Sequence, residues 1–362
     1  MNDWKAIFTP GLDWVAQAAQ GIPHRVPTYA QLVELMPEEL GKPAHEIFRT
    51  PELLMEGTFR LCHRYGIDVP SVDFDTYNIE AEAIGQPMVF HPQIAPDVDR
   101  THPMIRDKSD LKKIKTPDFE SAGRCPMVVR MYELIRETLD IEPAMAFCAP
   151  FSLAANIRGL SNLLMDIMTA PEFAKELFQR INHELLIPWL SHLHGKFPNT
   201  PAIVGADAMA SLPMVTPAIM EDWLAPGIEE LQQALEPPVC VPNWTGERHA
   251  KDPEKILDIR RRVNPGFVEG QDPDVEALGP EFYRDYADKH DLPLLIGLGA
   301  VFLNNATPEE VRKRVKHYVE VGNRDGRLWF YLCNLSPTTP KENIQAAVEA
   351  LHAYGTRVCT PA

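Results

Sequence analysis

The 362-residue sequence contains no apolar run close to the roughly 20 residues that a helix needs to cross a bilayer. Its first residues, MNDWKAIFTPGLDWVAQAAQG, lack the basic and apolar segments of a secretion signal. The six cysteines are dispersed and form no CxxC pair, which is typical of proteins kept in a reducing compartment. These absences predict a cytoplasmic protein that does not enter a membrane.

Basic residues are also scarce, because 35 Lys and Arg stand against 51 Asp and Glu, for a net charge of −16 at pH 7. This charge argues against nucleic acid or an anionic membrane surface as the main partner, since both are polyanions. Glycine-rich phosphate loops of the GxGxxG or GxxxxGK[ST] type are absent as well. An open doubly wound sheet with a nucleotide site is therefore the less favoured fold.

What the chain does contain is a regular alternation of short apolar segments and longer helix-like segments. Helical spacing of apolar residues covers 3–20, 28–35 and 51–65. The expected strands, each leading toward a helix, are 69–74, 144–148, 202–205, 239–241, 266–269, 292–297 and 328–332. The pattern predicts an α/β protein, a (β/α)8 TIM barrel over residues 67–362 with a helical N-terminal extension over residues 1–66.

In such a barrel the catalytic groups lie at the carboxyl ends of the strands and in the loops that follow. Acids and amides dominate these positions, which hold Asp73, Asp75, Tyr77, Glu80, Glu82, Cys148, Asp207, Asn243, Glu247, His249, Glu269, Asp272, Asn304, Asn305, Cys333 and Asn334. A single loop acid is more often a helix cap than a catalytic group. Glu254, which follows Asp252 and Pro253, fits this simpler interpretation.

Four segments, taken in order, resemble blocks of the uroporphyrinogen decarboxylase superfamily. They are FDTYNIEAEAIG (74–85), CAPFSLAANIRG (148–159), GADAMASLPMVTPAIMEDWLAPGIEEL (205–231) and LSPTTPKENIQAAVEAL (335–351). The first is similar to the segment after the first strand of corrinoid-linked members. The resemblance implies a TIM-barrel enzyme on the methyltransferase side of the superfamily.

Two motifs of the superfamily are missing from this chain. True uroporphyrinogen decarboxylases carry an arginine-rich, RQAGRY-like segment for the porphyrinogen carboxylates, whereas the comparable segment 22–35 has one arginine. Coenzyme M methyltransferases carry an HxCG zinc motif, where this chain reads Asn243-Trp244-Thr245-Gly246. Asparagine and threonine are poor zinc ligands beside imidazole and thiolate, so this zinc site is not expected, and only Cys333 stands where a third ligand would be.

A third pattern, E-x14-E-x20-H, matches Glu254, Glu269 and His290. It is associated with the methyltransferase I component of corrinoid-dependent aryl-ether O-demethylases, and the resemblance implies that these three residues bind zinc. The order of elements leaves an alternative open. His290 ends a helix of about ten residues, or about 15 Å, which places it at the rim opposite to Glu269. Ligands from one rim would be Glu269, His249, Asp207 and Cys333.

The implied reaction moves a methyl group from an aryl methyl ether to the Co(I) of a separate corrinoid protein and releases a phenol. The leaving oxygen must be polarised by zinc or protonated by an acid with a raised pKa, for which Asp207 and Glu80 are the candidates. The expected substrate-binding residues are Tyr77, Phe151, Asn243, Trp244 and Phe302. The corrinoid protein and a small aromatic ether are the expected partners, and a homodimer is compatible with the sequence.

Two other functions stay open at this point. One is a decarboxylase or lyase of the same fold, which would release CO₂ without a metal. The other is a non-catalytic barrel that binds a corrinoid or tetrapyrrole. Zinc content and pigment binding separate these functions from the methyltransferase.

Overall fold

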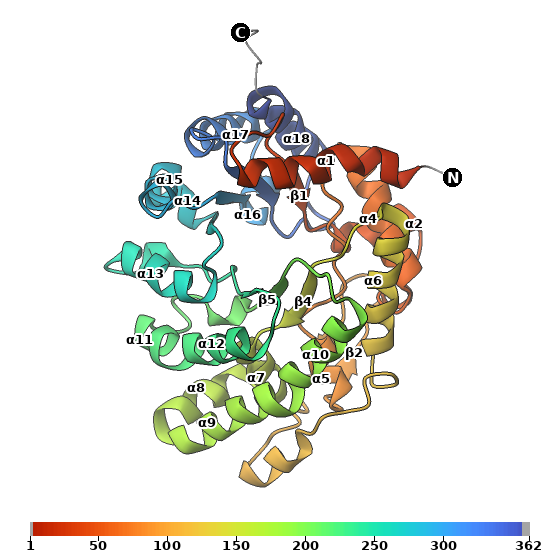
Figure 1. Ribbon diagram of the computed structural model, residues 1–362, viewed down its shortest axis with the longest axis vertical. Coiled ribbons are helices and arrows are strands. Elements are labelled where there is room, and N and C mark those ends of the chain that lie inside the picture. Colours follow the sequence, from red (N-terminus) through yellow and green to blue (C-terminus); the bar gives the residue numbers. More distant parts are fainter. Residues whose placement is uncertain (1–2, 357–362) are drawn as a thin grey trace. The chain divides into compact units, whose positions relative to one another are not determined.

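The computed structural model describes residues 3–356, in which the chain forms two compact units. The first unit contains the described residues of Met1–Lys42, Leu53–Asp73 and Gly266–Ala362, and the second contains Pro43–Glu52 and Phe74–Pro265. Each unit holds a parallel sheet accompanied by helices, so the predicted α/β class is confirmed (Figure 1). Closure of the strands into one eight-stranded ring and the division at residue 66 stay predictions.

The sheet of the first unit has four parallel strands in the order β1 (Thr28–Ala30), β9 (Leu328–Leu332), β8 (Leu294–Leu298) and β7 (Val268–Gln271). Alternate residues of each strand point to opposite faces. At Gly270 an added Cβ would lie 2.8 Å from Tyr283, so α15 packs against that face of β7. Glu269 and Gln271 therefore point to the other face.

Helices of the first unit pack around this sheet, and α17 and α18 lie side by side (Figure 1). A capping box between Thr307 and Glu310 begins α17. The helices are α1 (Trp4–Ala19), η1 (Val33–Leu35), α2 (Met36–Leu40), α4 (Pro51–Tyr65, in this unit from Leu53), α14 (Asp274–Leu278), α15 (Pro280–Lys289), α16 (Ala300–Asn305), α17 (Pro308–Gly322) and α18 (Lys341–Gly355).

The sheet of the second unit has three parallel strands, β4 (Met145–Cys148), β5 (Ile203–Ala206) and β6 (Val239–Cys240). A short antiparallel pair, β2 (Met88–Val89) and β3 (Asp97–Val98), accompanies it. The helices are α3 (Ala44–Ile47), α5 (Ile79–Ala83), η2 (Lys108–Lys113), α6 (Cys125–Leu139), α7 (Pro150–Arg158), α8 (Leu160–Thr169), α9 (Pro171–Arg180), η3 (Ile181–Leu186), α10 (Ile187–Lys196), η4 (Ala208–Ala210), α11 (Pro217–Ile219), η5 (Met220–Leu224), α12 (Ala225–Ala234), η6 (Glu247–His249) and α13 (Pro253–Val263).

Two expected elements near the N-terminus were wrong. The helix expected over 28–35 is instead β1 followed by the single turn η1, because pairing with β9 overrides the helical spacing. The strand expected over 69–74 is not formed. Only the amides of Asp68 and Val69 reach the carbonyl of Thr28, and Pro70 then removes the next donor.

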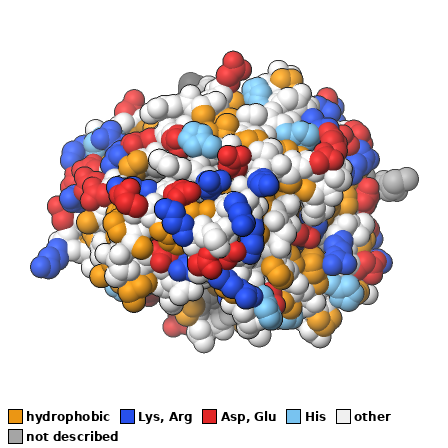
Figure 2. Space-filling model, turned by 90° about the horizontal axis from the view of Figure 1, so that it is seen from below, with side chains coloured by type: hydrophobic (Ala, Val, Ile, Leu, Met, Phe, Trp, Pro, Cys, Tyr) orange, Lys and Arg blue, Asp and Glu red, His pale blue; other side chains and the backbone are white. Residues whose placement is uncertain are grey.

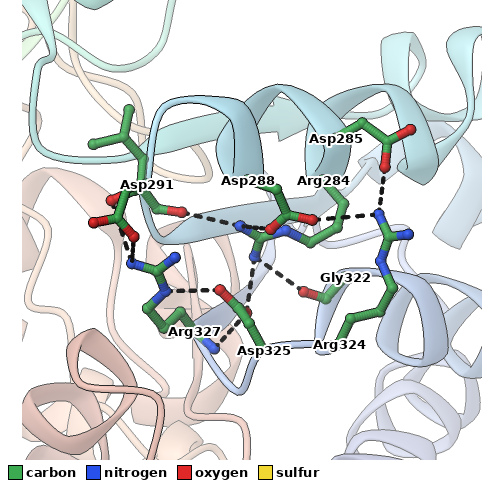
Figure 3. A network of polar contacts seen from close by, with 9 residues as sticks. Arg284, Asp285, Asp288, Asp291, Gly322, Arg324, Asp325 and Arg327 are labelled. Carbon is green, nitrogen blue, oxygen red and sulfur yellow. Dashed lines mark hydrogen bonds and ion pairs between the residues drawn. The ribbon is translucent and has the colours of Figure 1, made fainter.

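A network of ion pairs gathers at the amino ends of β8 and β9, around the fully buried Arg284 of α15 (Figure 3). Its guanidinium donates to the carboxylate of Asp325 at 3.0 Å and to the carbonyl of Leu292 at 3.0 Å, and it pairs with Asp288 at 2.8 Å. The Nε of Arg327 donates to the other carboxylate oxygen of Asp325 at 2.7 Å. The network ties the connections before two neighbouring strands to one helix.

The surface shown in Figure 2 mixes charges of both signs, and hydrophobic side chains are scattered between them. This mixture agrees with the sequence, in which acids outnumber bases without long blocks of one sign. Over residues 3–356, every helix is too short or too polar to cross a lipid bilayer.

Candidate active site

Polar side chains gather where the three strands of the second unit end. Asp207 follows β5 directly, Asn243 lies three residues beyond β6, and Ser152 lies in the first turn of α7 after β4. Tyr77 and Glu80 come from the segment that enters α5. The carboxyl ends of parallel strands meet at one edge of a sheet, and hydrogen bonds connect Ser152, Asp207, Asn243 and Tyr77. Glu80 accepts a hydrogen bond from the end of β4 instead. We call these five residues the strand-end cluster.

Asp207 is fully buried and uses both carboxylate oxygens. Oδ1 accepts from the backbone N–H of Ser152 at 2.8 Å, and Oδ2 accepts from the indole N–H of Trp244 at 3.0 Å. Burial raises the pKa of Asp207 to about 6, while the hydrogen bonds from Ser152 and Trp244 act in the opposite direction. Two donors stabilise the ionised form, so this carboxylate carries a charge at neutral pH.

Asn243 connects Asp207 to Tyr77. Its Oδ1 accepts from the backbone N–H of Asp207 at 2.8 Å, and its Nδ2 donates to the hydroxyl of Tyr77 at 2.9 Å. The phenol oxygen accepts this bond, so the phenol hydrogen is available to donate to a ligand. Burial raises the pKa of Tyr77, which keeps the hydroxyl protonated. Tyr77 and Asn243 are only partly buried, which suits residues that contact a substrate.

Glu80 is 1% exposed, and its Oε1 accepts from the backbone N–H of Cys148 at 3.3 Å. Its Oε2 is buried without a hydrogen bond of normal geometry. Burial raises the pKa of Glu80 to about 8, and the nearby charge of Asp75 adds to this effect. Glu80 is therefore protonated at neutral pH, whereas Asp207 is ionised. Environments that separate the pKa values of two acids in this way are typical of acid–base sites.

The predicted aromatic residues do not form one wall. Trp244 and Phe151 are fully buried, and Phe151 stacks on Phe178 with ring centroids 6.5 Å apart. Phe302 belongs to the first unit, where the guanidinium of Arg314 lies 3.5 Å from its ring centroid. It lines a pocket of about 420 Å³ beside α17. Of these aromatic residues only Tyr77 is both partly exposed and part of the strand-end cluster.

In the first unit, Glu269 lies beside Gln271 and Cys333. The Gln271 amide donates to the carboxylate of Glu269, and the Cys333 thiol donates to the Gln271 carbonyl oxygen with a distance of 3.7 Å. Tyr29 and Tyr331 stack next to this chain of bonds, with ring centroids 4.6 Å apart. Burial raises the pKa of Cys333, so in the absence of a metal the group at neutral pH is a thiol.

Of the predicted zinc ligands, the two in the first unit do not lie together. His290 caps α15 and packs on Tyr286, on the helix side of β7, whereas Glu269 points to the opposite face. Glu254 belongs to the second unit, in the first turn of α13 after the N-cap Asp252.

The alternative set fits no better. Asp207 uses both oxygens on protein donors, and His249 is exposed on η6. Within residues 3–356 no three His, Cys, Asp or Glu side chains stand together as a metal site. Both sets of zinc ligands therefore stay predictions.

Several residues in and around the site were not predicted from the sequence. Ser152 and Asn156 lie on α7, within the segment CAPFSLAANIRG (148–159) that resembles the superfamily, but neither was a candidate site residue. Arg124 binds Asp75 across 49 positions of sequence, and no local pattern predicts such a pair. The position of Ser152, four residues after the end of β4, is a signal that could have identified it as a site residue.

Comparison with known proteins identifies the family. Residues 15–234 match the family model described as uroporphyrinogen decarboxylase (URO-D). No curated protein sequence matches the chain. A methyltransferase from Methanosarcina mazei has a similar structure, with a TM-score of 0.73 and 17% identity over 93% of this chain and 97% of that chain. A B12-independent methionine synthase from Shewanella sp. W3-18-1 gives a TM-score of 0.41 and 15% identity over 83% of this chain and 85% of that chain. Because the family model covers more than half of its residues, the chain belongs to the uroporphyrinogen decarboxylase family.

Proposed function

We propose that this protein is a methyltransferase that demethylates an aryl methyl ether, with the corrinoid of a partner protein as the methyl acceptor. The similar fold of the Methanosarcina methyltransferase supports methyl transfer. The missing arginine-rich segment and the acidic character of the strand-end cluster favour an uncharged substrate over a polycarboxylate. We place the reaction in the cytoplasm, on a (β/α)8 barrel formed by residues 67–362 with the helical extension 1–66.

The observation that carries this proposal is that one short segment holds both a buried neutral acid, Glu80, and a partly buried phenol, Tyr77. As the bond between methyl carbon and ether oxygen breaks, the methyl group passes to Co(I), which becomes methyl-Co(III). The ether oxygen keeps the bonding electron pair and takes a proton, so the product is a phenol. Tyr77 would donate a hydrogen bond to that oxygen and Glu80 would supply the proton. The carboxylate of Asp207 would hold Trp244 and Ser152 in place through its two hydrogen bonds.

The test is to mix the purified protein with a reduced corrinoid protein and guaiacol without oxygen, and to follow methyl-Co(III) by its absorption. Formation of methyl-Co(III) together with the demethylated phenol is the expected result. Absence of methyl transfer from any methoxylated aromatic compound would overturn the proposal. Release of CO₂ from a porphyrinogen would assign the decarboxylase activity for which the family is named. Tight pigment binding without turnover would identify a carrier.

Replacing Tyr77 by phenylalanine is expected to reduce kcat about 3- to 10-fold. The substitution removes one hydrogen bond to the reacting oxygen, which is worth about 0.5–1.5 kcal/mol. Replacing the exposed Tyr354 on α18 by phenylalanine is the matched control, and it should leave the rate unchanged. Equal rates for the Tyr77 variant and the control would remove Tyr77 from the mechanism.

Zinc has no step in this proposal, because Glu269 and His290 lie on opposite faces of β7. We expect that replacing His290 by alanine leaves the zinc content of the purified protein unchanged. Elemental analysis of the wild type and of this variant measures that content directly. Loss of one zinc per chain on replacing His290 would establish the motif ligands and contradict the placement of His290 on the helix side of β7.

A further inference from the structure

A buried ion pair lies next to the segment that carries Tyr77 and Glu80. Arg124, the residue before α6, donates from Nη2 to Oδ2 of Asp75 at 2.8 Å, and the two side chains are each 5% exposed. Its Nε donates to Glu82 at 2.5 Å, and Glu82 is the more exposed partner. Burial of two charges is costly, and the cost is offset only when both are well paired. Solubility does not explain why this ion pair is buried, because an exposed pair would serve that purpose.

Asp75 has an unusual backbone conformation, with φ = 67° in the left-handed region. Residues other than glycine seldom adopt it, and Asn and Asp tolerate it best. The side chain of Asp75 accepts from Nδ2 of Asn78 at 2.6 Å, and its carbonyl accepts from the backbone N–H of Asn78 at 3.1 Å. These two bonds close a tight turn, and Tyr77 lies within it.

Asn78 connects the turn to the two residues that we assign to the chemistry, Tyr77 and Glu80. It is the residue before α5, which carries Glu80, and its Nδ2 also donates to the carbonyl of Pro96 at 3.2 Å. From α7, Asn156 donates to the carbonyl of Tyr77 at 2.8 Å. The Arg124–Asp75 ion pair and α7, through Asn156, thus both hold the turn.

We propose that the Arg124–Asp75 pair is a positioning element, which fixes the turn so that Tyr77 and Glu80 face the reacting oxygen; this role rests on the function proposed above. Neither residue of the pair would touch substrate. The fixed geometry matters because a displacement of about 1 Å at a reacting group can cost about 100-fold in rate.

Asp75 also acts on the charge state of Glu80. The groups that face Glu80 are Asp75 from the preceding turn, Cys125 from α6, Cys148 from β4 and Trp189 from α10. Of these, Asp75 carries a negative charge and disfavours a second one on Glu80. Removing the charge of Asp75 should lower the pKa of Glu80 and move the loss of its proton to lower pH.

The test compares Asp75→Asn with Asp75→Ala. Asparagine tolerates the left-handed backbone and can still accept from Asn78, so Asp75→Asn removes mainly the charge. We expect Asp75→Asn to lower kcat about 100-fold with little change in KM, and to shift the alkaline limb of the pH profile to lower pH. Asp75→Ala should lose at least as much. The matched control is Asp97→Asn, which removes the acid of an exposed pair with Arg100 at 2.9 Å and should behave as the wild type.

Two further measurements separate the role of the ion pair from a folding defect and from failure of the proposed activity. The double variant Asp75→Asn with Arg124→Gln leaves neither charge buried alone, and it should fold and show the same loss of activity as Asp75→Asn. In protein labelled with ¹³C-glutamate, an NMR titration without substrate reports Glu80 directly, with the signal assigned by Glu80→Gln. A lower midpoint in Asp75→Asn supports the role of the pair even if the wild type shows no methyl transfer. Wild-type values for Asp75→Asn in both the titration and the pH profile would overturn the inference.

Discussion

Replacing Arg284 by methionine is expected to lower the free energy of unfolding by about 3–5 kcal/mol, because it removes one partner of a fully buried ion-pair network. Methionine fills much of the volume but leaves the carbonyls of Leu292 and Gly322 without their donor. Asp325 keeps its bond to Arg327, so the loss should not reach the sum of all contacts drawn in Figure 3. Urea or guanidinium unfolding followed by circular dichroism measures the change.

The matched control for Arg284 lies in the same network. Arg324 pairs with Asp285 at 2.5 Å, but its side chain is 47% exposed. Replacing it by methionine should cost less than about 1 kcal/mol, since exposed ion pairs contribute little. If both variants lost the same stability, burial of Arg284 would not explain its importance. The network lies at the amino ends of β8 and β9, so we expect it to contribute to stability and not to the chemistry.

Most of the elements could be predicted from the sequence because each has a strong local signal. Proline begins α4, and the helical spacing over 51–65 predicts its bounds. The strand β9 was predicted at 328–332 because its apolar run lies between a glycine-containing turn and a polar loop. β1 was missed because a three-residue strand has almost no signal of its own and depends on its partner, β9.

The candidate site was predictable only in part. The strand-end rule found Asp207 and Asn243, which follow β5 and β6, because position after a strand is a local property. Tyr77 and Glu80 were expected after a strand over 69–74, which does not form. The rule did not reveal how their environments differ: Glu80 has one buried oxygen without a normal hydrogen bond, whereas Asp207 accepts two. Those differences arise from side chains far apart in sequence.

The zinc motif, which stays a prediction, has a different weakness. Its spacing is a property of the sequence alone, and spacing does not tell which face of a sheet a residue will occupy. Glu269 and His290 match the motif, yet β7 separates them, since α15 packs on one face and Gln271 and Cys333 lie on the other. The expectation from helix length, that His290 ends its helix, agrees with its place as the C-cap of α15.

Replacing Glu80 by glutamine is expected to reduce methyl transfer about 10²- to 10⁴-fold, which is the usual contribution of a general acid. Glutamine keeps the shape and can still accept from the backbone N–H of Cys148, but it has no proton to give. In the wild type the rate should fall as the pH rises through about 8, where Glu80 ionises. The residual activity of the variant should lack this alkaline limb. A variant within about 10-fold of the wild type would assign the proton to another group.

The same substitution should change how stability depends on pH. The pKa of Glu80 is about 8 in the folded protein, above the ordinary 4.5, so the folded state holds this proton more tightly than the unfolded state does. Its contribution to stability is complete below the ordinary pKa and is lost as the pH rises toward 8, by about 1.4 kcal/mol per pH unit. Glu80→Gln should therefore gain stability relative to the wild type as the pH increases, while replacing the exposed Glu133 of α6 by glutamine should not. Unfolding curves at about pH 5 and about pH 8 that kept the same difference between Glu80→Gln and the wild type would show that Glu80 is already ionised in the folded protein.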